Sequence, residues 1–206
     1  ALVSLASVNA FANNVITIDD IANIKSIRDS VISPSGDYVA YTRSLPRELY
    51  VDKHGANYSE LFISDGKGNE RAFISGKVNV GALEWSADGK YVYFLAKFKD
   101  EKFTQLYRIP VDGGERQKVL ALKESSISRY DISPDGKQVA LLAMPAKDKS
   151  EKKLKDLGFK AEVYEMGLEN KQLFVTDLAL QDKAVALGAL NIAGFVSDMN
   201  WSADNK

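Results

Sequence analysis

The chain contains the segment Asp131-Ile132-Ser133-Pro134-Asp135-Gly136-Lys137-Gln138-Val139-Ala140-Leu141, and close copies of it recur earlier and later. The copies are Ile32-Ser33-Pro34-Ser35-Gly36-Asp37-Tyr38-Val39-Ala40-Tyr41, Trp85-Ser86-Ala87-Asp88-Gly89-Lys90-Tyr91-Val92-Tyr93-Phe94 and Trp201-Ser202-Ala203-Asp204-Asn205-Lys206. In each copy a large apolar residue ends one strand, and a turn leads to a returning strand. Proline presets φ in the turn, the Ser or Asp side chain accepts a backbone N–H, and glycine takes a positive φ. The segment therefore predicts a repeated β-hairpin.

A second repeated element extends each hairpin to four strands. The third strand recurs as Glu60-Leu61-Phe62-Ile63, Gln105-Leu106-Tyr107-Arg108-Ile109 and Gln172-Leu173-Phe174-Val175, and a turn and a fourth strand follow each time. The last of these turns is expected at Ala179-Leu180-Gln181-Asp182. The returning strands are apolar at consecutive positions, as in a sheet covered on both faces. The repeat of about 50 residues matches a propeller blade of four strands.

We therefore predict an all-β fold, a β-propeller with four-stranded blades of which about three and a half are present. The blades are expected at about 31–76, 77–125 and 126–190, and the next begins at 191–206. A closed ring needs four to eight blades, so we expect the sequence to be part of a longer protein.

Two connections between second and third strands are longer than the repeat requires. The first blade carries about eight extra residues and the third about twenty, an insertion placed at 144–170. Both lie on the face opposite the Ser-Pro-Asp-Gly turns. Since binding residues concentrate on loops that a rigid scaffold positions, we expect function on this face.

The N-terminal residues indicate a location. The stretch from Ala1 to Val8 is short, apolar and rich in small residues, and Ala10-Phe11-Ala12 fits the small-x-small pattern that precedes a signal-peptide cleavage site. We expect the remnant of a signal peptide and a periplasmic or secreted protein, the alternative being an apolar strand or tail. Residues 13–30 form an N-terminal segment with a short helix, in which Thr17 is the N-cap and Ile18, Ile21 and Ile24 share one side.

Composition excludes several classes of function. The formal net charge is −1 with both signs interspersed, so nucleic acid is not an expected partner. The absence of cysteine excludes disulfides, thiolate metal sites and cysteine catalysis. No apolar segment is long enough to span a membrane.

The single histidine, His54, lies on the loop from Ser44 to Tyr58, where we expect a solvated side chain rather than a catalytic or metal-binding one. We expect no metal and no cofactor.

The third-blade insertion holds the candidate substrate-binding residues. It opens with a charged stretch, Lys147 to Asp156, and continues to a loop in which Glu162 and Glu165 flank Tyr164. Two carboxylates so placed can hold a cationic group, such as the free amine of a peptide, by charge-assisted hydrogen bonds. The alternative is a pair of exposed carboxylates without a ligand.

The repeat resembles the propeller repeat shared by the Tol-system propeller protein and the prolyl oligopeptidase family of serine peptidases. The opening Thr17-Ile18-Asp19-Asp20-Ile21-Ala22, together with Leu157-Gly158-Phe159 and Val163-Tyr164-Glu165 in the insertion, is similar to the acylaminoacyl-peptidase and dipeptidyl-peptidase branch. In that family the propeller caps a C-terminal α/β-hydrolase domain that carries a Ser-Asp-His triad, and glutamates on a propeller insertion bind the substrate's N-terminus in some members. The resemblance implies a peptide substrate and the role of Glu162 and Glu165, although these two are not adjacent as in the family's pair.

The chain itself contains no Gly-x-Ser-x-Gly nucleophile motif, so we expect no catalytic residue in it. We expect the non-catalytic propeller of a secreted serine peptidase, which gates and orients short peptides for a missing hydrolase domain. The alternative is a periplasmic Tol-like propeller that binds a protein partner without catalysis. A sugar- or cofactor-binding propeller enzyme has no supporting residues, because the carboxylates are scattered.

Overall fold

The computed structural model describes residues 16–48, 50–144, 156–158, 170–180, 188–190, 192 and 196–204. These residues contain the helix α1 and eleven strands. Their bounds are α1 (Ile18–Ala22), β1 (Ile27–Ile32), β2 (Val39–Leu45), β3 (Tyr58–Ser64), β4 (Glu70–Ile74), β5 (Val80–Trp85), β6 (Tyr91–Ala96), β7 (Gln105–Pro110), β8 (Gln117–Leu120), β9 (Ile127–Ile132), β10 (Gln138–Ala143) and β11 (Gln172–Asp177).

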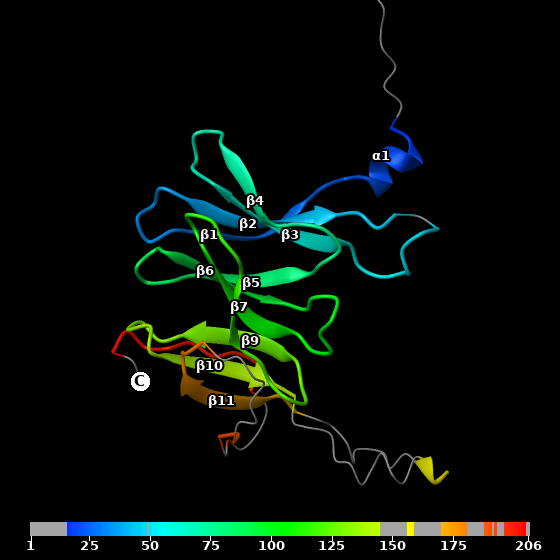
Figure 1. Cartoon of the computed structure of the whole chain (residues 1–206). Coiled ribbons are helices and arrows are strands. Elements are labelled where there is room, and N and C mark those ends of the chain that lie inside the picture. The colour runs from blue at the N-terminus through cyan, green and yellow to red at the C-terminus, as the bar shows by residue number, and fades with distance from the viewer. Residues whose placement is uncertain are drawn as a thin grey trace, which may run out of the picture.

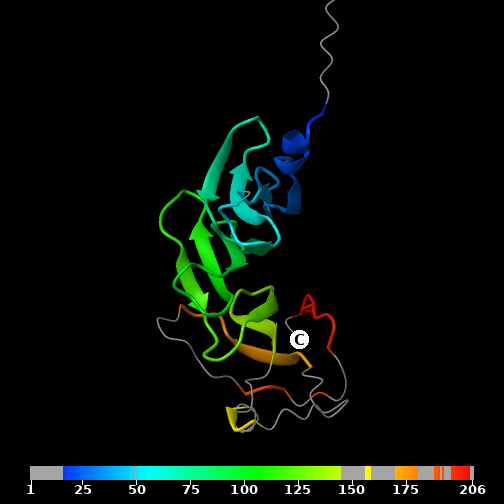
Figure 2. The same ribbon diagram turned by 90° about the vertical axis from the view of Figure 1, so that its right-hand side faces the viewer.

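Within this part of the chain the strands form three antiparallel sheets, each built from consecutive strands. The first has the order β1-β2-β3-β4, the second β5-β6-β7-β8, and the third joins β9, β10 and β11. The sheets follow one another along an arc, and β1 and β4 lie on opposite sides of the first (Figures 1 and 2). The predicted all-β propeller fold is confirmed, and each sheet is one blade.

The third blade continues beyond β11. The backbone N–H of Leu190 donates to the carbonyl of Leu173 at 2.8 Å, which places residues 188–190 beside β11 where the fourth strand is expected. The second half of the predicted turn, Gln181 and Asp182, lies outside the described residues.

The repeated turns use the serine as the sequence predicts. The hydroxyl oxygen of Ser133 accepts the backbone N–H of Gln138 at 2.9 Å, and that of Ser86 accepts the N–H of Tyr91 at 2.9 Å. Ser133 is buried. Gly136, with φ of +68°, completes the turn in the left-handed region. Each hairpin is therefore held at its turn by a side chain as well as by its ladder of backbone hydrogen bonds.

Two apolar cores lie between successive blades, and β6 contributes to both. Its residues Val92, Phe94 and Ala96 pack toward the first blade, whereas Tyr93 and Leu95 pack toward the third. Side chains alternate between the two faces of a strand. The consecutive apolar residues of β6 are therefore required by a sheet that is covered on both sides.

The helix α1 forms as predicted. Thr17 is its N-cap: the Thr17 hydroxyl accepts the N–H of Asp20 at 3.1 Å, and the Asp20 carboxylate accepts the N–H of Thr17 at 2.8 Å. Ile18, Ile21 and Ile24 are all exposed, so their shared side contacts no core within the described residues. Among the described residues, no helix is long and apolar enough to cross a membrane. The predicted signal-peptide remnant, residues 1–12, lies outside the described residues.

Candidate substrate-binding face

The connections from the second to the third strand of each blade emerge on one face of the molecule, which we call the loop face. They span residues 46–57, 97–104 and 144–171. Figure 1 shows the described parts of these connections toward the right, and the Ser-Pro-Asp-Gly turns toward the left. The loop face is turned toward the viewer in Figure 2.

Arg47 organises the first of these connections. Its Nε donates to the carbonyl of Ala56 at 2.6 Å, and its Nη1 donates to the carbonyl of Lys53 at 3.0 Å. The guanidinium also lies 4.2 Å from the centre of the Tyr58 ring. A single side chain thus joins both ends of the loop to the start of β3, which favours one conformation.

Asp52 and His54 lie on the same loop. The Asp52 carboxylate accepts Lys77 Nζ at 2.6 Å and the N–H of Glu48 at 2.9 Å, and these hydrogen bonds hold the Asp52 pKa below its usual value. Asp52 is thereby committed to a structural ion pair. His54 is exposed, and the described residues contain no group of three His, Cys, Asp or Glu side chains that could hold a metal ion.

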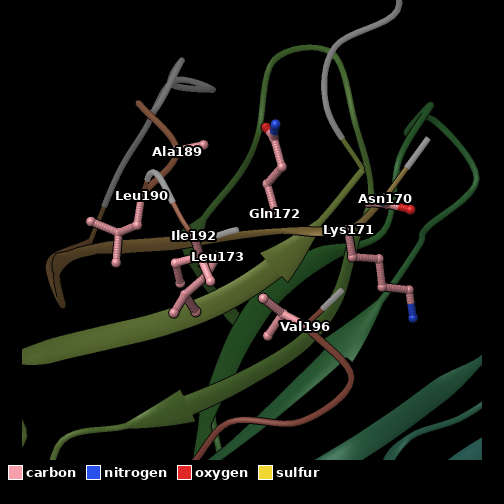
Figure 3. Close-up of a pocket in the computed structure, with 8 residues that line it drawn as sticks. All are labelled: Asn170, Lys171, Gln172, Leu173, Ala189, Leu190, Ile192 and Val196. Carbon is pink, nitrogen blue, oxygen red and sulfur yellow. The ribbon is translucent and has the colours of Figure 1, made fainter. Parts of the chain in front are cut away.

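A cavity of about 410 Å³ opens where the third-blade insertion joins β11. Its lining is a polar part, Asn170, Lys171 and Gln172, and an apolar part, Leu173, Ala189, Leu190, Ile192 and Val196 (Figure 3). A volume of this size suits a small ligand or one or two residues of a peptide. The sequence analysis placed function on this face but did not identify these residues.

The predicted substrate-binding residues Glu162, Tyr164 and Glu165 lie outside the described residues. The connection that carries them reaches β11 through Asn170 and Lys171, which line the cavity. Their binding of a peptide amine stays a prediction.

Sequence reasoning also missed a set of carboxylates on the innermost strands that join one blade to the next. Asp29 in β1 accepts the N–H of Ala82 at 3.2 Å, Glu84 in β5 accepts the N–H of Ile132 at 3.3 Å, and Asp131 in β9 accepts the N–H of Trp201 at 2.6 Å. A signal for them existed, because Glu84 and Asp131 each directly precede the large apolar residue of the repeat.

The environment of Glu84 favours its neutral form. Burial raises the Glu84 pKa to about 8, and the nearby charge of Asp131 contributes to this rise. Tyr130, also on β9, donates its hydroxyl proton to the carbonyl of Ala82 at 2.7 Å, and burial raises its pKa as well. These groups form a tightly packed seam between the second and third blades and make no visible catalytic arrangement.

Residues 50–143 match the family model described as the dipeptidyl peptidase IV (DPP IV) N-terminal region. This stretch is similar to the N-terminal propeller region of dipeptidyl peptidase IV. The resemblance to the propellers of the prolyl oligopeptidase family is thereby confirmed.

Solved structures support the propeller fold. A prolyl endopeptidase shares 19% sequence identity with a TM-score of 0.55, over 89% of this chain and 25% of that one. The acylaminoacyl peptidase of Pyrococcus horikoshii shares 18% identity with a TM-score of 0.54, over 76% of this chain and 24% of that one. TolB from Acinetobacter baumannii shares 18% identity with a TM-score of 0.46, over 78% of this chain and 31% of that one. No curated protein sequence matches significantly.

The chain thus spans about a quarter of the length of the two peptidases it resembles. At these identities the likeness establishes the fold.

Proposed function

We propose that this chain is the propeller portion of a serine peptidase that hydrolyses short peptides, and that the propeller gates and orients the substrate. The observation that carries the proposal is the match of residues 50–143 to the DPP IV N-terminal region. The nucleophile and its general base are expected on an α/β-hydrolase domain outside this sequence, because the chain contains no Gly-x-Ser-x-Gly motif.

The loop face supports the gating role. Arg47 orders the first loop through contacts with Lys53, Ala56 and Tyr58. At the third blade a cavity with an apolar wall and a polar rim lies beside the insertion that carries Glu162 and Glu165. An ordered loop on the first blade and a cavity on the third, both on the loop face, can admit an extended peptide and orient it, while the blades exclude folded proteins by size.

Labelling the full-length protein with a fluorophosphonate, read by mass spectrometry, tests this function. A labelled serine, in a chain long enough for a hydrolase domain, is the expected result, because only an activated serine reacts. An unlabelled chain that consists of blades alone would reject the peptidase and favour a propeller that binds a protein partner.

We also propose that the protein is exported to the periplasm or secreted. The support is the apolar segment that ends at Ala10-Phe11-Ala12. N-terminal sequencing of the mature protein should begin at Asn13. A mature protein that retains residues 1–12 would contradict export through a cleaved signal.

A further inference from the structure

The residue directly before the leucine of the third repeated strand makes the same kind of hydrogen bond in the first two blades. In the second blade the Gln105 amide oxygen accepts the N–H of Leu122 at 2.8 Å, and its Nε2 donates to the carbonyl of Leu122 at 3.4 Å. Gln105 is 5% exposed. In the first blade Glu60 accepts the N–H of Gly76 at 2.8 Å. This side chain therefore hydrogen-bonds to the backbone just after the fourth strand, an interaction that we call the clasp.

In the third blade the same clasp is open. The carbonyl of Leu173 accepts the N–H of Leu190, and in the second blade Leu106 is the register partner of Leu120. Two residues further along the chain, Ile192 therefore corresponds to Leu122. Yet the N–H of Ile192 donates to the carbonyl of Leu190 at 3.0 Å, and within the described residues the Gln172 side chain makes no hydrogen bond.

The residues of the clasp are buried in the second blade and more exposed in the third. Leu122 is 5% exposed, whereas Ile192 is 46% exposed, and Gln172 is exposed where Gln105 is buried. The cavity of about 410 Å³ lies at this position. In Figure 3 the Gln172 side chain points away from Leu173, Leu190, Ile192 and Val196. All five residues line the cavity, so the open clasp leaves the Gln172 amide at its polar rim and the apolar side chains at its wall.

We propose that this cavity binds a peptide residue with an apolar side chain, and that Gln172 pairs with that residue's N–H and C=O as Gln105 pairs with Leu122. The apolar side chain packs on Leu173, Leu190 and Ile192. Exposed side chains change rotamer within nanoseconds, so Gln172 can turn toward the ligand. The proposal deepens and rests on the proposed function, since it names the peptide class that the propeller receives.

The chemistry of the lining favours a peptide over other small ligands. A primary amide offers one donor and one acceptor side by side, which matches the N–H and C=O of one residue in an extended backbone. Among the described lining residues Lys171 contributes the only charged side chain, so an uncharged amide flanked by an apolar group suits the rest of the cavity. The residue bound in the cavity should therefore be one whose N–H and C=O both belong to peptide bonds.

Peptide binding to the full-length protein tests the proposal. The probe is N-acetyl-leucine methylamide, titrated by saturation-transfer NMR, and the matched compound is the depsipeptide in which an ester oxygen replaces the leucine N–H. We expect saturable binding of the amide and binding at least about tenfold weaker for the ester, because one buried hydrogen bond is lost and a carbonyl lone pair faces an ester oxygen.

Variants connect the binding to Gln172. Gln172→Leu should weaken amide binding about tenfold, and Gln172→Glu, which keeps the acceptor and loses the donor, should weaken it less. Gln138→Leu is the control, because Gln138 is an exposed glutamine at the opposite end of the same blade. It should leave the affinity unchanged. Thermal melting of each variant shows whether the blade remains folded.

Two results would overturn the proposal: absence of saturable amide binding to the wild type, or equal binding by a folded Gln172→Leu variant. Hydrogen exchange supplies a third, since an Ile192 amide that exchanges as slowly as that of Leu122 without peptide, and faster in Gln172→Leu, would mean that Gln172 rather than the Leu190 carbonyl protects it and closes on its own chain. None of these measurements uses activity. A serine labelled by fluorophosphonate beside a cavity that binds no peptide would reject this inference and leave the proposed peptidase standing.

Discussion

The carboxylate of Glu84, on the innermost strand of the second blade, accepts the backbone N–H of Ile132 on the innermost strand of the third at 3.3 Å. The next carboxylate in the series, Asp131, holds Trp201 in the same manner at 2.6 Å. The repeat therefore carries its own connection between blades. Since each contact reaches from one blade to the next, changes at these positions should affect the whole arc.

Substitution of Glu84 by glutamine should stabilise the protein at neutral and higher pH. The folded-state pKa of Glu84 is raised to about 8 by burial and by Asp131, so folding must hold a proton that the unfolded chain releases above its ordinary pKa. Stability contributed by this site falls as pH rises from about 4.5 to about 8. The side-chain amide introduced by Glu84→Gln carries no such cost, and its oxygen still accepts the N–H of Ile132.

Thermal midpoints of wild type and E84Q, measured near pH 5, 7 and 8.5, check this. The difference should be small near pH 5 and grow toward pH 8.5, with the variant more stable by an amount on the order of a few kcal/mol. Glu115→Gln, at an exposed position of the same blade, serves as the control. A difference that does not change with pH would show that Glu84 is ionised in the folded protein.

Substitution of Trp85 by phenylalanine should loosen the seam between the first two blades. The Trp85 Nε1 donates to the carbonyl of Val31 at 3.0 Å, and Trp201 makes the equivalent bond to Asp131 at 2.9 Å. Phenylalanine keeps most of the apolar contact and leaves the Val31 carbonyl without this donor, at a cost of about 1 to 3 kcal/mol. Denaturant unfolding of W85F and of the matched W201F measures it. An unchanged midpoint for W85F would mean that water replaces the indole N–H.

Substitution of Gly136 by alanine should destabilise the third hairpin by about 1 kcal/mol, because the residue has φ of +68°. A Cβ at this position would meet no atom within 4 Å, so the cost comes from the backbone conformation alone. Gly188→Ala is a closely matched control, since a Cβ there also meets nothing and no positive φ is recorded. Equal thermal midpoints for the two variants would contradict the role of the left-handed turn.

Substitution of Arg47 by methionine should free the first loop of the loop face. Methionine retains an apolar side chain over the Tyr58 ring but loses the hydrogen bonds to Lys53, Ala56 and Tyr58. We expect faster proteolytic cleavage within residues 48–57 and faster amide exchange there, without a comparable change at β6. Arg71→Met is the control, because Arg71 also lies over an aromatic ring, that of Phe73, but makes no side-chain hydrogen bond to a loop among the described residues. A loop that resists protease as in the wild type would show that Asp52 and Lys77 alone order it.

The repeat could be predicted from sequence because its determinants are local. Pro34, Pro134 and the turn glycines act on their own backbone angles, and the capping box of Thr17 and Asp20 spans a single helical turn. The consecutive apolar residues of β6 were readable too, since only a sheet covered on both faces needs them.

The candidate site could not be predicted in the same manner. Gln105 and Gln172 occupy the same position of the repeat and have the same side chain, yet one is buried in a clasp and the other is exposed beside a cavity. No local pattern distinguishes them, because the difference depends on where residues after the fourth strand lie.

The sequence by itself determined the hairpins, their length and their order, because turn geometry and side-chain alternation act over a few residues. Only the tertiary structure decided which carboxylates would hold the next blade and which clasp would stand open. Glu84 contacts Ile132, whereas Gln172 does not contact Ile192. In both pairs the two residues are distant in the chain. Such contacts exist only after the blades have packed, since burial and partner geometry, rather than residue type, then decide what each polar side chain binds.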